Sequence, residues 1–172
     1  FFKSNTTRPL KDSVKENIFN IIINSKLFNI NLFNSNILDL YSGIGSFGLE
    51  CISRGAKKII FVEKNEKAAE ILNKNLAHLA VQNKADIVKD DIINFLNDKI
   101  TLKFEIIFLD PPFKKNDYIE DLQLLQKKKI YKKNHIVIIH RESKSQEDIE
   151  KIIKPLIIKQ YGRSKIIFGE FL

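Results

Sequence analysis

Two short stretches of the sequence contain residue types that could carry chemistry. The first is Asp110 to Phe113, Asp-Pro-Pro-Phe, which closes an apolar run. Two consecutive prolines have no N–H for a sheet ladder, so a strand is expected to end there. The second is Gly43 to Gly48, which has the spacing G-x-G-x-x-G between an expected strand and an expected helix. A glycine loop followed by a helix N-terminus is typical of a nucleoside-cofactor site.

The Asp-Pro-Pro-Phe stretch suits methylation of an exocyclic amino group on a planar ring. Such a nitrogen is a poor nucleophile because its lone pair is delocalised, and it needs acceptors for its protons. The Asp110 carboxylate and the Pro111 carbonyl can supply two, and the fixed φ of Pro111 and Pro112 presets the direction of the carbonyl. Phe113 can stack on a base that has been flipped out. The alternative is a stiff turn at a strand end.

Acidic residues near the glycine loop indicate which cofactor would bind. Glu63 ends the next expected strand, where a carboxylate accepts hydrogen bonds from ribose hydroxyls. Asp39 precedes the loop and suits the ammonium of S-adenosylmethionine better than a pyrophosphate. Asp90 or Asp91 can accept a hydrogen bond from the adenine amino group, unless they only cap the following helix. The predicted cofactor contacts are Asp39, Tyr41, Ser42, Gly43, Gly45, Glu63, Asp90 and Asp91.

These residues need a scaffold of alternating strands and helices, which the hydrophobic pattern predicts. We expect an α/β fold with a seven-stranded, mainly parallel sheet. Its one antiparallel strand comes from a C-terminal hairpin around Gly162 and Arg163, and the fourth strand lies next to the first. The expected helices are 10–26, 45–54, 65–79, 91–98, 116–126 and 146–154. The expected strands are 35–41, 57–63, 85–90, 104–110, 135–141, 156–162 and 164–171.

Composition limits the remaining choices. The 172 residues predict a single domain over 1–172, with 1–34 as an N-terminal helical segment before the glycine loop. The net charge of +8 favours polyanionic partners. One cysteine, no paired histidines and no apolar stretch of about 20 residues argue against a disulfide framework, a metal site and a membrane span. We expect a cytoplasmic monomer. Because the chain contains no methionine, we also expect that its original N-terminus is missing.

These motifs together resemble those of the RsmD-type bacterial 16S ribosomal RNA guanine-N2 methyltransferases. The resemblance is carried by 39–50, 53–56, Val62-Glu63, 110–113 and the more specific segment TRPLKDSVKENIFNII at 7–22. It implies a class I Rossmann-like methyltransferase fold with helices on both faces, S-adenosylmethionine as cofactor, and a guanine in small-subunit RNA as target. Ser13 and Lys15 replace two arginines of the family, and His140-Arg141 stands where the family more often has a glutamate.

RNA contacts are expected on the rim around the Asp-Pro-Pro-Phe stretch. The candidate phosphate contacts are Arg8, Lys11, Lys15, Lys114, Lys115 and Arg141. The predicted partner is ribosomal RNA or the small ribosomal subunit. Alternative interpretations are a DNA or protein-glutamine amino-methyltransferase, a non-catalytic RNA-binding protein and, from the glycine spacing alone, a nicotinamide oxidoreductase.

Overall fold

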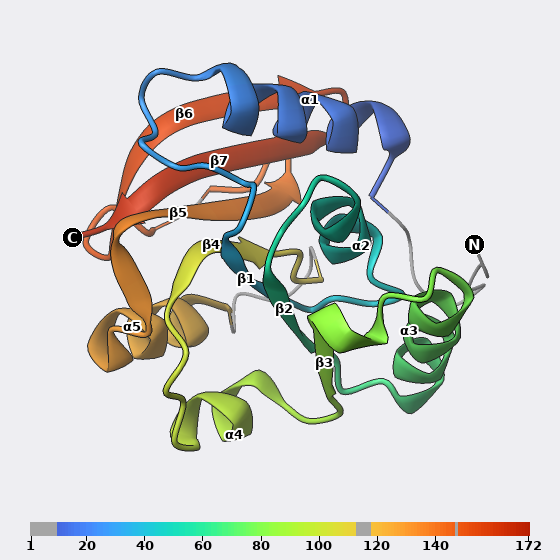
Figure 1. Ribbon diagram of the computed structural model, residues 1–172. Helices are drawn as coiled ribbons and strands as arrows, with labels where there is room; N and C mark the ends of the chain where they lie inside the picture. The colour runs from blue at the N-terminus through green and yellow to red at the C-terminus, as the bar shows by residue number, and fades with distance from the viewer. Residues whose placement is uncertain (1–9, 113–117, 147) are drawn as a thin grey trace.

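A seven-stranded sheet runs through the centre of the structure, a computed structural model that describes residues 10–112, 118–146 and 148–172 (Figure 1). The strand order is β3-β2-β1-β4-β5-β7-β6. Strands β1 to β5 are parallel, whereas β7 is antiparallel to both of its neighbours. This confirms the predicted sheet. The strands are β1 (Asn36–Leu40), β2 (Lys58–Val62), β3 (Ala85–Val88), β4 (Phe104–Leu109), β5 (Tyr131–Glu142), β6 (Ile153–Tyr161) and β7 (Ser164–Phe171).

Helices cover both faces of this sheet. They are α1 (Asp12–Asn24), α2 (Ser46–Ser53), α3 (Glu66–His78), α4 (Ile92–Asn97) and α5 (Tyr118–Lys128), with a short 3₁₀ turn at Gln82–Lys84. Apolar residues of α1, α2 and α3 pack in one core layer with alternate residues of the central strands. Those of α4 and α5 pack in a second layer on the opposite face. The central strands are therefore buried on both faces, which explains their nearly continuous apolar runs.

The register of β1 and β4 places polar groups at one end of the sheet. Asp39 lies opposite Phe108, and Leu40 lies opposite Leu109. Asp39 is 1% exposed, an exceptional acidic residue inside a fully buried strand. Because parallel strands end at the same edge, Asp39, the glycine loop and Asp110 meet at the carboxyl edge, as an open α/β sheet requires of a ligand site.

The segment before the hairpin differs from the sequence prediction. The expected helix over 146–154 is wrong: Ile149 accepts backbone hydrogen bonds from Ile152 and Ile153, and these make a single turn. Strand β6 then starts at Ile153, which pairs with Phe171, earlier than the expected 156. The three isoleucines have helical spacing, but they are buried in the second core layer while the chain turns into the sheet. Tertiary pairing therefore overrides the local pattern.

Strand β5 is also longer than predicted. It begins at Tyr131, four residues before the expected start, because Tyr131 pairs with Phe104 across an irregularity in the ladder. The lysine-rich segment before the apolar run is therefore part of the sheet, and Lys132 forms an ion pair with Glu105 at 2.5 Å.

Candidate active site

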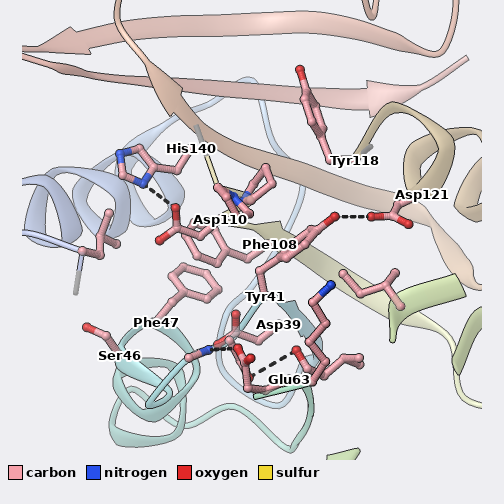
Figure 2. Close-up of a pocket in the computed structure, with 18 of the residues that line it drawn as sticks. Asp39, Tyr41, Ser46, Phe47, Glu63, Phe108, Asp110, Tyr118, Asp121 and His140 are labelled. Atoms are coloured by element: carbon pink, nitrogen blue, oxygen red, sulfur yellow. Dashed lines mark hydrogen bonds and ion pairs between the residues drawn. The ribbon is translucent and has the colours of Figure 1, made fainter. Parts of the chain in front are cut away.

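A cavity of about 610 Å³ lies at the carboxyl ends of the central strands. Figure 2 shows side chains from the glycine loop, β4 and β5 gathered around it. Of the residues predicted from the sequence, eleven described ones line it: Lys11, Asp39, Tyr41, Ser42, Gly43, Glu63, Asp90, Asp91, Asp110, Pro111 and Pro112. The structure thus brings together residues that are spread over a hundred positions of the chain.

Asp39 is a fully buried carboxyl group of the site, 1% exposed. Its Oδ2 accepts a hydrogen bond from the Gly48 backbone N–H at 3.0 Å. Its Oδ1 is buried and has no hydrogen-bond partner among the described residues. Burial raises the pKa of Asp39 well above its usual value, and the nearby carboxylates of Asp110 and Glu63 raise it further, against the lowering effect of Gly48. A buried acceptor in this state is suited to a cationic ligand group.

Two glycines of the loop lie so close to their neighbours that a side chain would not fit, and one of them, Gly48, lies against Asp39. A Cβ on Gly48 would lie 2.2 Å from the ring of Phe61 and 2.9 Å from Asp39 Oδ2. Gly45 precedes α2 with φ of +85°, and its Cβ would lie 2.3 Å from a methyl carbon of Leu72. Gly45 therefore shapes the loop but does not line the cavity, whereas Gly43 does.

Glu63 accepts hydrogen bonds from two backbone segments, the glycine loop and the N-cap of α3. Its Oε2 accepts from the Gly43 N–H at 2.7 Å, and its Oε1 accepts from the Asn65 N–H at 2.8 Å. Each carboxylate oxygen has two acceptor sites. One site on each oxygen therefore remains for a pair of ligand hydroxyls, the arrangement that a ribose needs.

Asp90 and Asp91 both line the cavity but have different local roles. Asp91 caps α4, because its Oδ1 accepts from the Ile93 N–H at 3.1 Å. Asp90 Oδ1 accepts from the Asn94 side-chain amide at 2.9 Å and the Asp91 N–H at 2.6 Å. These two hydrogen bonds lower the pKa of Asp90, and the bond from Asn94 has the larger effect. The capping interpretation therefore holds for Asp91, and neither residue loses its place beside the cavity.

Asp110 follows β4 and is held by a partner that the sequence analysis did not assign to the site. His140 Nδ1 lies 2.8 Å from Asp110 Oδ1, and His140 Nε2 lies 2.9 Å from Ser164 Oγ. Figure 2 shows the ring of His140 facing the carboxylate of Asp110. The side chain of Asp110 is 24% exposed and that of His140 is 9% exposed. The carboxylate thus lies between the interior and the cavity.

The position of Arg141 contradicts its predicted role as an RNA contact. Arg141 is 1% exposed, so its guanidinium cannot reach a phosphate at the surface. Instead, its Nη1 donates to the Pro112 carbonyl at 3.2 Å, and the guanidinium carbon lies 4.5 Å from the centre of the Tyr118 ring. Arg141 therefore braces the two-proline turn from inside the protein.

The other predicted RNA contacts have mixed positions. Lys11 is exposed at the start of α1 and lines the cavity. Lys15 forms an ion pair with Asp12 at 3.1 Å on the same helix. Arg8, Phe113, Lys114 and Lys115 lie outside the described residues, so their predicted roles stay predictions.

Sequence reasoning also missed the contact between Tyr41 and α5. The Tyr41 hydroxyl donates to Asp121 Oδ2 at 2.5 Å, and Asp121 is 3% exposed (Figure 2). Eighty residues separate the two side chains. No spacing in the sequence predicts this contact, because Tyr41 and Asp121 are brought together only by the packing of α5 on the sheet.

Two classes of site have no candidate in the described part of the chain. No cluster of three or more histidine, cysteine, aspartate or glutamate side chains there could hold a metal ion. None of the helices formed by the described residues is long and apolar enough to cross a membrane.

Comparison with known proteins gives one matching family and relatives that share one name. Residues 1–170 match the family described as "Conserved hypothetical protein 95". The chain is 32% identical over 163 residues to the ribosomal RNA small subunit methyltransferase D of Buchnera aphidicola subsp. Baizongia pistaciae, covering 93% of this chain and 78% of the relative. The protein of the same name from Haemophilus influenzae is 33% identical over 137 residues, covering 78% and 68%.

Solved structures agree with the fold. A methylase of Haemophilus influenzae has a TM-score of 0.76 at 30% identity, with 94% of this chain and 98% of that chain covered. A methyltransferase of Escherichia coli has a TM-score of 0.83 at 24% identity, with coverage of 98% and 89%, and shows the fold alone.

Proposed function

The chain belongs to the family described as "Conserved hypothetical protein 95" and is an S-adenosylmethionine-dependent RNA methyltransferase, and we propose that its target is the exocyclic N2 amino group of a guanine in small-subunit ribosomal RNA. The observation that carries the proposal is the placement of the Asp110 carboxylate and the two-proline turn on the same cavity as buried Asp39. The Asp110 carboxylate suits an amino group that must lose a proton, whereas buried Asp39 suits the cationic end of the cofactor.

The described residues fit the cofactor. The unpartnered Oδ1 of Asp39 would accept from the ammonium of its amino-acid end. Glu63 would accept from the ribose hydroxyls with the acceptor sites that its backbone partners leave. The adenine amino group would meet Asp90 or Asp91, and Tyr41, Ser42 and Gly43 would complete the wall. When bound, S-adenosylmethionine supplies a methyl group on a positively charged sulfur: the amine lone pair bonds to the methyl carbon, and the sulfur leaves as a neutral thioether.

The chain itself positions the amine and receives its proton. Asp110 would accept one amino N–H, and the Pro111 carbonyl would accept the other. Withdrawing both protons from the ring plane favours the pyramidal nitrogen whose lone pair can react. No covalent intermediate is needed, so most of the rate would come from orientation and fixed electrostatics. Pro111 is buried and Arg141 holds the Pro112 carbonyl at 3.2 Å, which keeps the turn rigid.

The experiment is methyl transfer from labelled S-adenosylmethionine to small-subunit RNA and particles, followed by mapping of the labelled nucleotide. We expect label on N2 of one guanine. Label on an adenine or cytosine amino group, or only in DNA or protein, would contradict the proposal. Because an amide nitrogen and the amino groups of other bases are also planar, base mapping is needed to choose among them.

Asp110→Asn is the matched substitution for the catalytic role, because it keeps the shape of the side chain and removes its charge. We expect methyl transfer to fall by about a hundredfold or more, while cofactor affinity changes by only a few-fold. Ser145→Ala, in the turn after β5, is the control and should retain full activity. Asp110→Asn with normal turnover would show that Asp110 is only a strand-end residue.

A further inference from the structure

A chain of three hydrogen-bonded side chains lies at the wall of the cavity. Ser164 is the first residue of β7, His140 is near the end of β5, and Asp110 follows β4. The Ser164 hydroxyl lies 2.9 Å from His140 Nε2, and His140 Nδ1 lies 2.8 Å from Asp110 Oδ1. Ser164 is 8% exposed and His140 is 7% exposed. All three residues line the cavity, and Asp110 is the most exposed of them, with 24% of its side chain accessible.

The sheet fixes this arrangement. Strands β4 and β5 pair with Phe108 opposite Ile138, so two further residues along each strand bring Asp110 beside His140. Strands β5 and β7 pair with His140 opposite Ile166, which makes Ser164 a diagonal neighbour on the same face. Neighbouring strands thus bring the backbones of the three residues together, and the hydrogen bonds fix how their side chains point.

The chemistry of the partners sets the direction of the hydrogen bonds. A carboxylate can only accept, so His140 Nδ1 carries a hydrogen and donates it to Asp110. In the neutral ring Nε2 then accepts from the Ser164 hydroxyl. Because Nδ1 already carries its hydrogen, the ring cannot take a second one from Asp110 at that nitrogen. His140 therefore acts by holding the carboxylate in place.

We infer that His140, oriented by Ser164, is a positioning residue that fixes the Asp110 carboxylate for methyl transfer. The inference rests on the proposed role of Asp110. The two prolines fix the backbone after Asp110, but they leave its own side-chain torsions free. With Oδ1 bound to His140, Oδ2 is directed to the substrate amino group. A misplacement of about 1 Å is enough to cost about a hundredfold in rate. The effect belongs in kcat, because the two ring nitrogens of His140 contact Asp110 and Ser164, so the ring acts through the Asp110 carboxylate.

Four variants test the inference. His140→Leu removes both ring nitrogens. His140→Asn keeps a donor near the position of Nδ1, and His140→Gln keeps one near the position of Nε2 instead. Ser164→Ala removes only the hydroxyl and is the variant least able to disturb folding. The matched control is His135→Asn, at the opposite end of β5, where His135 bonds to the Phe171 N–H at 3.0 Å.

We expect His140→Leu to lower kcat by about tenfold to a hundredfold, with KM for RNA and Kd for S-adenosylhomocysteine within about threefold of wild type. His140→Asn should recover most of that loss and His140→Gln little of it. Ser164→Ala should lower kcat by a few-fold, and His135→Asn should leave kcat unchanged. Thermal unfolding and S-adenosylhomocysteine binding are measured on every variant to show that each is folded.

The inference is overturned if His140→Leu keeps the wild-type kcat, if His140→Asn is no better than His140→Gln, or if the loss appears in KM or Kd. If His140→Leu does not fold, an unchanged kcat in Ser164→Ala overturns it. Wild-type turnover on RNA is measured first. Absence of turnover on any RNA counts against the function, whereas normal wild-type turnover with unaffected variants counts against the role of His140 alone.

Discussion

Replacement of Asp39 by asparagine should separate the stability of the protein from its ability to bind the cofactor. Asp39 is 1% exposed, its Oδ2 accepts from Gly48 at 3.0 Å, and its Oδ1 has no partner among the described residues. Asparagine has nearly the same shape and can still accept from the Gly48 N–H. Asp39→Asn therefore removes the buried charge while the packing stays the same.

The two effects have opposite signs. A buried polar group without a partner costs about 1–3 kcal/mol, more when it is charged. Asparagine still leaves one buried polar atom without a partner, so only the extra cost of the charge is relieved. Ligand-free Asp39→Asn should therefore be at least as stable as wild type, and each 1 kcal/mol gained raises Tm by roughly 2–4 °C in a chain of this size. Loss of a charge-assisted hydrogen bond to the cofactor ammonium should cost about 1.5–3 kcal/mol, or about tenfold to 150-fold in Kd.

The pH dependence gives a second signature of the same group. The pKa of Asp39 is raised in the folded protein, chiefly by burial, above its ordinary value of 3.8. The folded protein therefore binds a proton at a pH where the unfolded chain does not, and ligand-free stability gains as pH falls through the raised pKa towards 3.8. Cofactor affinity should weaken over the same pH range, because protonated Asp39 cannot pair with the ammonium. Both pH effects should be absent in Asp39→Asn.

Isothermal titration with S-adenosylhomocysteine and thermal unfolding of the ligand-free protein measure the two quantities. Methylthioadenosine, which lacks the amino-acid end, is the control ligand, and its affinity should be the same for both proteins. The reasoning is refuted if Asp39→Asn binds S-adenosylhomocysteine as well as wild type, if methylthioadenosine loses equally, or if the ligand-free variant is clearly less stable.

Three further substitutions or conditions test the supporting structure. Gly48→Ala should destabilise the protein by about 1–3 kcal/mol in urea unfolding, because the new Cβ would lie 2.2 Å from the Phe61 ring; an unchanged midpoint would show that the loop is not tightly packed. Burial lowers the pKa of His135 below 6.5, so wild type should lose free energy of unfolding relative to His135→Asn as pH drops below about 6.5, and the same pH dependence in both proteins would contradict this. Arg141→Lys should lower Tm through loss of the bond to Pro112 and leave the salt dependence of RNA binding unchanged; a smaller salt slope would restore the predicted phosphate contact.

The sequence alone predicted the features that depend on local order. The alternation of strands and helices, the glycine loop, the strand-end carboxylates and the final hairpin all follow from the period of apolar residues and from glycine and proline. The grouping of Asp39, Glu63 and the loop on one cavity also follows, because they lie at expected strand ends. Where local spacing competed with sheet pairing, at 146–154, the helical pattern lost and β6 began at Ile153.

Only the tertiary structure decided which neighbours these residues have. Arg141 follows the apolar run of β5 as an exposed contact would, yet it is buried beneath the two-proline turn. His140 and Ser164 are 24 positions apart, and Tyr41 and Asp121 are 80 positions apart. Such pairs depend on the register between strands and on how a helix packs on the sheet. Hydrophobic periodicity tells which face a residue occupies, but the partner it meets there is set by packing of distant segments.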